Sequence, residues 1–179
     1  MRIFIGLPVP ENIQNQLGEA WKNVKTYPTH DAPMKPSLWH MTIAYLNDVP
    51  DEAIEPLREL VGKSLMHPPE GYLYIDRFET FPPRQPTRVV ASVTPENPKQ
   101  WRMFVEGIRD LISLVAPNVD RMPWNPHISI IRKEKGLHLS HWQENFDRLS
   151  WRHKDIAIIR SEHGPGGAKY TNLHVFPVE

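Results

Sequence analysis

Cysteine is absent from this sequence of 179 residues, which excludes disulfide bridges, thiolate metal ligands and a cysteine nucleophile. Net charge is absent too, because 21 Lys and Arg residues balance 21 Asp and Glu residues. A neutral chain does not attract long nucleic acids, so any nucleic-acid partner should be gripped locally. No apolar run approaches the roughly 20 residues of a membrane span, and apolar residues 1–8 are too few for a signal peptide. We therefore expect a cytoplasmic protein with no membrane partner.

Proline is abundant, with 19 residues that cluster at the ends of segments, as at Pro82-Pro83. This distribution indicates short elements separated by turns. The chain is long enough for one core, or for two small lobes that share one. Since no shift in composition marks a linker, we expect residues 1–179 to form a single domain.

The spacing of apolar residues predicts an α+β fold. We expect strands at residues 2–9, 38–46, 72–81, 88–93, 127–131, 154–161 and 170–178, and helices at residues 10–24, 51–65, 100–115 and 140–149. Each half of the chain contains strands and helices that could cover them. The order of elements indicates two lobes that face each other across a cleft.

One short pattern occurs twice, at His40-Met41-Thr42-Ile43 and at His127-Ile128-Ser129-Ile130. Side chains alternate between the faces of a strand, so the histidine and hydroxyl of each copy share one face. The apolar residues point to the other face, toward the core. If the strands are adjacent, two imidazoles and two hydroxyls meet, and such a set can move two protons while holding a phosphate. The alternative is a pair of half-buried histidines bonded to the backbone, but the repetition of the whole pattern argues against it.

Around these copies the sequence resembles the two-histidine phosphoesterase superfamily. It is most similar to the bacterial and archaeal RNA 2′,3′-cyclic phosphodiesterases, first described as 2′–5′ RNA ligases. The resemblance covers nearly the whole chain, through residues 2–8, 39–46, 126–132 and 161–170 and the pair Phe176-Pro177. Ser129 stands where many relatives have threonine, which keeps the hydroxyl. Tyr45 replaces the phenylalanine that follows the first signature in some members.

The resemblance implies a bilobal fold of two pseudo-symmetric lobes of antiparallel sheet, with covering helices, around a central cleft. It implies hydrolysis of the terminal 2′,3′-cyclic phosphate of RNA to a 2′-phosphate, a reaction of RNA processing, without a metal or other cofactor. In that family His40 is the proton donor and His127 the proton acceptor, while Thr42 and Ser129 bind the phosphate. The residues alone do not separate the roles of the two histidines. The expected partners are RNA ends or oligonucleotides that carry the cyclic phosphate, and we expect a monomer.

Two further residues have two interpretations each. Arg132 is a candidate phosphate ligand, but strict alternation places it on the face opposite His127, as a solvated arginine at a strand end. Tyr45 is a candidate for stacking on a nucleobase, but alternation places it in the core with Met41.

Two rival functions use the same residues. A 2′–5′ RNA ligase would join the cyclic phosphate to a 5′-hydroxyl end, which takes the place of water. A non-catalytic protein that binds RNA ends is the other rival. Such a protein could lose one of the four histidine and hydroxyl residues, so the intact set favours an enzyme.

Overall fold

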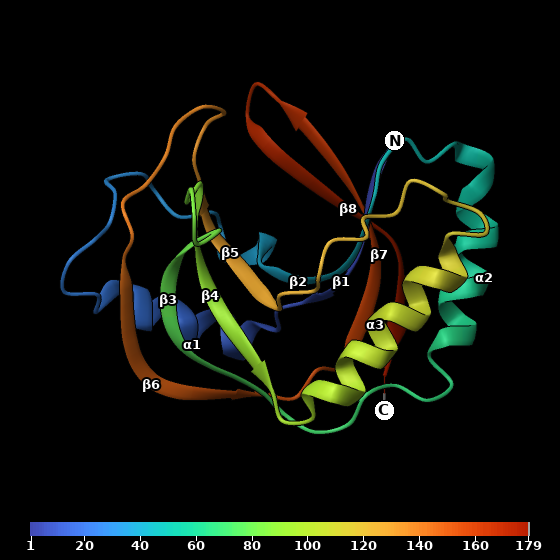
Figure 1. The fold of residues 1–179 in the computed structure, drawn as a ribbon, viewed down its shortest axis with the longest axis horizontal. Coiled ribbons are helices and arrows are strands. Elements are labelled where there is room, and N and C mark those ends of the chain that lie inside the picture. Colours follow the sequence, from blue (N-terminus) through green and yellow to red (C-terminus); the bar gives the residue numbers. More distant parts are fainter. Residues whose placement is uncertain (179) are drawn as a thin grey trace.

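The computed structural model describes residues 1–178 and shows an α+β fold built on one eight-stranded sheet (Figure 1). The strands are β1 (Arg2–Pro8), β2 (His40–Leu46), β3 (Leu73–Phe81), β4 (Arg88–Pro95), β5 (His127–Arg132), β6 (Gln143–Trp151), β7 (Asp155–Gly164) and β8 (Gly167–Pro177). Their order in the sheet is β6-β3-β4-β5-β2-β1-β7-β8, and every neighbouring pair is antiparallel.

Three α-helices pack on this sheet, where apolar residues at helical spacing give each helix one buried side. They are α1 (Glu11–Lys22), α2 (Ile54–Ser64) and α3 (Pro98–Ile112), and short 3₁₀ turns cover Pro36–Leu38 and Asp51–Ala53. In α1 the buried residues are Ile13, Leu17 and Trp21. Among residues 1–178 no helix is long and apolar enough to cross a membrane.

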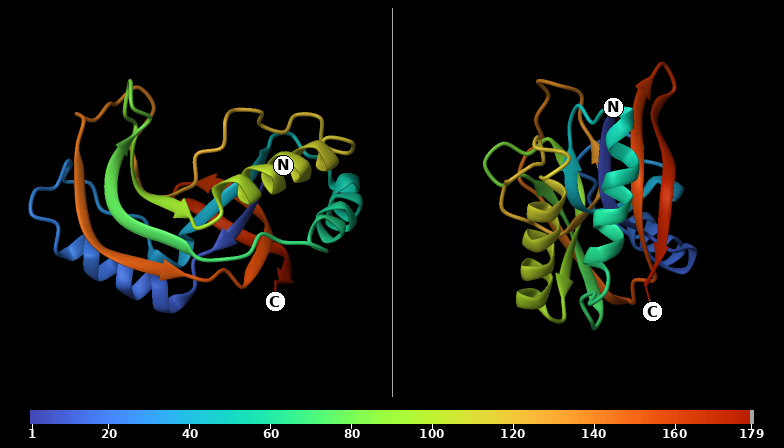
Figure 2. Two further views of the ribbon diagram at one scale, coloured as in Figure 1. Left: turned by 60° about the horizontal axis from the view of Figure 1, so that its bottom comes forward. Right: turned by 90° about the vertical axis from the view of Figure 1, so that its right-hand side faces the viewer.

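The sheet consists of two four-stranded halves that meet at β2 and β5, as the lobes expected from the sequence require. Each half is covered partly by a helix that connects strands of the other half. The α1 helix joins β1 to β2, yet its Trp21 packs edge-on against Phe78 of β3, with ring centroids 5.0 Å apart. The α3 helix joins β4 to β5, yet its Arg109 donates a hydrogen bond to the carbonyl of Ile43 in β2. The two halves are thereby held to each other; Figure 2 shows their arrangement from two further sides.

The helix expected at residues 140–149 is wrong, because residues 143–149 belong to strand β6 and the structure has no helix at residues 140–142. The register of β6 against β3 is irregular where β6 carries Phe146. Extra residues at this irregularity let Phe146 and Leu149 both pack against the core although they are three positions apart. Spacing of three is typical of a helix, so the irregular strand has the apolar pattern of a helix.

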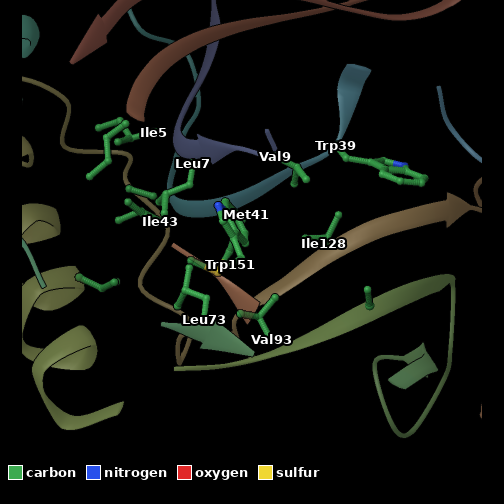
Figure 3. Packing of buried hydrophobic residues seen from close by; sticks show 14 of the residues in the cluster. Ile5, Leu7, Val9, Trp39, Met41, Ile43, Leu73, Val93, Ile128 and Trp151 are labelled. Carbon is green, nitrogen blue, oxygen red and sulfur yellow. The ribbon is translucent and has the colours of Figure 1, made fainter. Parts of the chain in front are cut away.

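The two faces of the sheet differ in what covers them. The main core lies on the face with the helices, and Figure 3 shows Met41 and Ile128 within it. The opposite face carries a small apolar cluster in which Tyr45 and Tyr170 pack against three buried residues: Phe4, Ala157 and Ile159. We call this second face the histidine face, because it carries His40, which stacks on Phe4.

Candidate active site

Strands β2 and β5 bring the two copies of the repeated pattern together. Met41 is the Cα partner of Ile128 in an antiparallel pairing, and both side chains are fully buried in the main core. The residues on either side of this pair point to the opposite face. In this register His40 lies opposite Ser129, and Thr42 lies opposite His127. Each imidazole therefore faces a hydroxyl of the other copy.

The two imidazoles are held in the same way, each by a carbonyl two residues earlier in the chain. Nδ1 of His40 lies 2.9 Å from the carbonyl oxygen of Leu38, and Nδ1 of His127 lies 2.7 Å from that of Asn125. A carbonyl oxygen only accepts, so Nδ1 carries the proton and donates it in both residues. Nε2 is therefore the atom of each histidine that is left to exchange a proton with a substrate.

Aromatic rings fix both imidazoles further. The ring of His40 stacks on Phe4 with centroids 4.2 Å apart and meets Tyr170 edge-on at 5.3 Å. The ring of His127 lies beside Phe81 at 5.1 Å. The sequence gives no sign that these three aromatic residues contact the histidines, because an aromatic residue in a strand is usually a core residue and all three lie far from the signatures in sequence.

Burial lowers the pKa of both histidines. The pKa of His40 falls to about 4, chiefly because the imidazole is only 8% exposed, and the positive charge of Arg132 lowers it further. Burial also lowers the pKa of His127, and the charges of Arg88 and Arg132 add to this effect. The hydrogen bond from each Nδ1 offsets part of the shift, and at His127 the negative charge of Glu79 offsets more.

A bulge in β2 changes the position of Tyr45. Ile43 is an extra residue, since the Cα partners on its two sides are consecutive in β1. These partners are Gly6↔Thr42 and Ile5↔Ala44. One extra residue shifts the alternation by one, so Tyr45 returns to the histidine face and packs in the cluster with Phe4. The expectation that Tyr45 points into the main core with Met41 is wrong.

A bulge at the equivalent position of β5 does the same for Arg132. Ile130 is the extra residue here, between the pairs Val90↔Ser129 and Val89↔Ile131. Arg132 pairs with Arg88 of β4, and its charge lowers the pKa of His40 and of His127, so Arg132 lies on the histidine face close to both. Strict alternation placed Arg132 on the opposite face, which is wrong, and the bulge is the reason.

Hydrogen bonds from outside the sheet satisfy the bulged backbone. The carbonyl of Ile43 accepts from Nε of Arg109 at 3.2 Å, and that of Ile130 accepts from the backbone N–H of Met34 at 2.8 Å. The carbonyl of Thr42 accepts from the indole N–H of Trp124 at 2.9 Å. Buried carbonyls need such partners, and the bulges therefore depend on segments distant in sequence.

A polar cluster adjoins His127 on the side of β3. Ser92 is the Cα partner of His127, and its hydroxyl donates to Oε1 of Glu79 at 2.5 Å. Nε of Arg77 lies 3.3 Å from Oε2 of the same carboxylate. In the sequence these residues belong to ordinary strand patterns. Nothing in those patterns indicates that this cluster lies beside His127.

Residues 1–178 contain no group of three or more His, Cys, Asp or Glu side chains that could hold a metal ion. The side chains that β2 and β5 bring together at the site carry imidazole, hydroxyl and guanidinium groups. Two imidazoles can accept and donate protons, and the hydroxyls and the guanidinium can bind an oxyanion.

Two pseudo-symmetric half-sheets that place two His-x-Thr/Ser patterns side by side define a two-histidine phosphoesterase. The chain belongs to the 2′-5′ RNA ligase superfamily, whose family model matches residues 9–165. This match confirms the resemblance that the two signatures indicate.

Individual relatives are distant in sequence and close in fold. The chain is 24% identical over 133 residues to the RNA 2′,3′-cyclic phosphodiesterase of Bacillus subtilis (strain 168), which covers 74% of this chain and 72% of that protein. The crystal structure of TT0787 of Thermus thermophilus matches with a TM-score of 0.81 at 24% identity, over 99% of this chain and 98% of that one. E. coli LigT in its apo form matches with a TM-score of 0.72 at 20% identity, over 98% and 96% of the two chains. These solved structures establish the shared fold.

Proposed function

We propose that this protein hydrolyses the terminal 2′,3′-cyclic phosphate of RNA to a 2′-phosphate, without a metal, by acid–base catalysis from its two histidines. The observation that carries this proposal is the matched orientation of the imidazoles. Each Nδ1 is engaged by a backbone carbonyl, at 2.9 Å for His40 and 2.7 Å for His127, which leaves both Nε2 atoms for the substrate. Opening a cyclic diester with water needs one base and one acid, and a pair of Nε2 atoms supplies them.

In the proposed reaction Nε2 of His127 accepts a proton from water as its oxygen attacks phosphorus. The bond between phosphorus and the ribose 3′ oxygen breaks, and Nε2 of His40 donates a proton to that oxygen. The products are a 2′-phosphate and a 3′-hydroxyl. Thr42 and Ser129 donate hydrogen bonds to the phosphoryl oxygens as negative charge builds on them, and Arg132 adds a charged donor.

Burial of His40 bears on this assignment of roles. With a pKa of about 4 in the free protein, His40 holds few protons near neutral pH. A bound phosphodiester is an anion, and its charge raises the pKa of the imidazoles beside it. The proton donor, His40, is therefore protonated mainly in the complex with substrate. Binding of the substrate comes first, and the raised pKa then allows His40 to take up its proton.

The relatives support a nucleotide substrate. The Bacillus subtilis relative is named a 2′,3′-cyclic phosphodiesterase, and LigT was solved in complex with 3′-AMP. On this basis we propose RNA ends and oligonucleotides as partners, with Tyr45 available for stacking on a base. We also propose that residues 1–179 work as a single domain, since α1 and α3 each pack across the two halves of the sheet, and that the protein is a monomer.

The family name gives ligation as the second candidate, in which an RNA 5′-hydroxyl replaces water at phosphorus. The two reactions use the same Nε2 atoms, so the products separate them. The test is to incubate the protein with adenosine 2′,3′-cyclic phosphate in EDTA and to identify the product isomer by chromatography. We expect adenosine 2′-phosphate. Activity that requires a divalent ion, a 3′-phosphate product or binding without turnover would contradict the proposal.

To detect ligation, the same assay is run on an RNA with a 2′,3′-cyclic end and a second RNA with a 5′-hydroxyl. Hydrolysis leaves the chain length unchanged, whereas ligation produces a longer RNA with a 2′–5′ bond. We expect the hydrolysed end to dominate.

A further inference from the structure

Two arginines lie side by side at one end of the histidine face. Arg88 begins β4 and Arg132 ends β5, and their Cα atoms are partners in the antiparallel pairing. Like charges placed directly opposite each other destabilise a sheet. Burial lowers the pKa of Arg88, and the charge of Arg132 lowers it further. An arrangement of this kind is stabilised when an anion binds to it.

No carboxylate among residues 1–178 supplies that negative charge. Within residues 1–178 neither Arg88 nor Arg132 takes part in an ion pair. Glu79, an acidic residue on the same face, is already engaged by Ser92 and Arg77. The neighbouring Lys133, in contrast, is paired with Asp31. Arg88 thus offers its guanidinium to a ligand.

Arg88 lies near His127 but on the side away from His40, because its charge lowers the pKa of His127, whereas Arg132 lowers the pKa of both histidines. Along β4 it lies four residues from Ser92, the Cα partner of His127, which corresponds to ~13 Å of strand. Its guanidinium carbon lies 6.0 Å from the centroid of Phe81, so the side chain leans toward β3 and away from the strand of His40. A phosphate held between His40 and His127 therefore lies beside Arg132, whose charge reaches both histidines, while Arg88 lies next to Phe81 on the side of His127 that faces away from His40.

We propose that Arg88 binds a second phosphate of the substrate, the one on the 5′ oxygen of the nucleotide that carries the cyclic phosphate. This inference rests on the proposed function and specifies its substrate class. A ribose whose 2′ and 3′ oxygens share one phosphate can carry another phosphate only on its 5′ oxygen. In RNA this group is the last phosphodiester of the chain. The site is thus built for RNA ends and 5′-phosphorylated nucleotides, in preference to cyclic nucleosides without a 5′-phosphate.

The test compares two substrates, adenosine 2′,3′-cyclic phosphate and the same compound with a 5′-phosphate. We expect the unmodified protein to give a kcat/KM 10- to 100-fold higher for the 5′-phosphorylated compound, which corresponds to ~1.4–2.7 kcal/mol, the size of one charge-assisted contact. In Arg88→Ala the ratio of the two kcat/KM values should fall to near one. The control is Arg84→Ala, which removes the same charge from an exposed position in the adjoining loop and should keep the full ratio.

A ratio near one in the unmodified protein, or a ratio that survives Arg88→Ala, would overturn the inference while hydrolysis itself stands. If neither compound is hydrolysed, the proposed function fails. In that case the affinities of adenosine 2′,5′-bisphosphate and adenosine 2′-phosphate, measured by calorimetry, test whether Arg88 binds the 5′-phosphate. Tighter binding of the bisphosphate that disappears in Arg88→Ala supports the subsite, and equal binding of both compounds refutes it. Thermal midpoints verify that both variants are folded.

Discussion

The indole N–H of Trp124 donates a hydrogen bond of 2.9 Å to the backbone carbonyl of Thr42. This bond joins the segment that leads into His127 to the strand that carries His40. Within residues 1–178, only one Cα pair, Met41 with Ile128, connects β2 to β5 in the ladder. The bond from Trp124 is therefore a main constraint on how the two signatures lie relative to each other.

Trp124→Phe should remove this bond while keeping the ring stack on Trp101, whose centroid lies 5.8 Å away. We expect a loss of ~1–3 kcal/mol in the free energy of unfolding, because the carbonyl of Thr42 loses a partner. kcat should fall as well, since the positions of Thr42 and His40 become less well defined. The matched control is Trp39→Phe, because the buried indole N–H of Trp39 has no partner among residues 1–178. Equal effects of the two substitutions in denaturation and in kcat would contradict a positioning role.

His40→Asn and His127→Asn should each lower kcat by ~10²-fold or more, the usual effect of removing a positioned acid or base. Asparagine retains a side-chain N–H near the backbone carbonyl that Nδ1 contacts. His40→Asn should also lower the thermal midpoint, because the imidazole stacks on Phe4 at 4.2 Å. Steady-state kinetics and thermal denaturation separate the two effects. Normal kcat in a folded variant of either histidine would exclude it from the chemistry.

The pH dependence of kcat/KM should be displaced to the acid side. The productive form of the free enzyme carries one proton on the histidine pair, and both pKa values lie below the ordinary 6.5. kcat/KM should therefore decrease with rising pH already below neutrality, by about tenfold per unit beyond the upper apparent pKa of the pair. kcat should begin to decrease only at a higher pH than kcat/KM does, because the bound anion raises the pKa of the donor. Rates measured from pH 4 to 9 test this, and a kcat/KM that rises steadily into alkali would refute it.

Stability should depend on pH through His40. Its pKa is about 4 in the folded protein, against the ordinary value of 6.5 for a solvated histidine, so the unfolded chain binds a proton over the interval in which the folded protein does not. Stability is fully present above pH 6.5 and is lost as pH falls toward 4, by about 3 kcal/mol at most. Urea denaturation at pH 7 and pH 4.5 measures the loss. In His40→Asn the loss should be smaller, and an equal loss would assign it to other groups.

Thr42→Val and Ser129→Ala test the binding of the phosphoryl oxygens. If the hydroxyls act mainly in the transition state, kcat falls by up to ~10²–10³-fold while KM changes little. The double variant should lose less than the product of the single losses, because both hydroxyls act on one phosphate. Steady-state kinetics of the three variants is the measurement. An unchanged kcat in both single variants would show that the hydroxyls only support the strands.

The sequence by itself determined the framework of the site. Alternation within each copy of the pattern places His40 with Thr42 and His127 with Ser129, and it buries Met41 and Ile128 on the other face. Local pattern is sufficient here, because side-chain direction in a regular strand depends only on position along the chain. The seven expected strands and three of the four expected helices follow from the same kind of local information, whereas strand β6 does not.

Features that depend on the pairing of one strand with another were decided only by the tertiary structure. The bulges at Ile43 and Ile130 exist because of register against β1 and β4 and because distant groups satisfy their carbonyls, and they alone bring Tyr45 and Arg132 to the histidine face. The irregular pairing with β3 likewise made residues 143–151 a strand although their apolar spacing is helical. Arg88 met Arg132 only through the pairing of β4 with β5. The pKa values of His40 and His127 depend on burial and on charged neighbours that are remote in sequence. A pattern in the linear sequence contains neither kind of information.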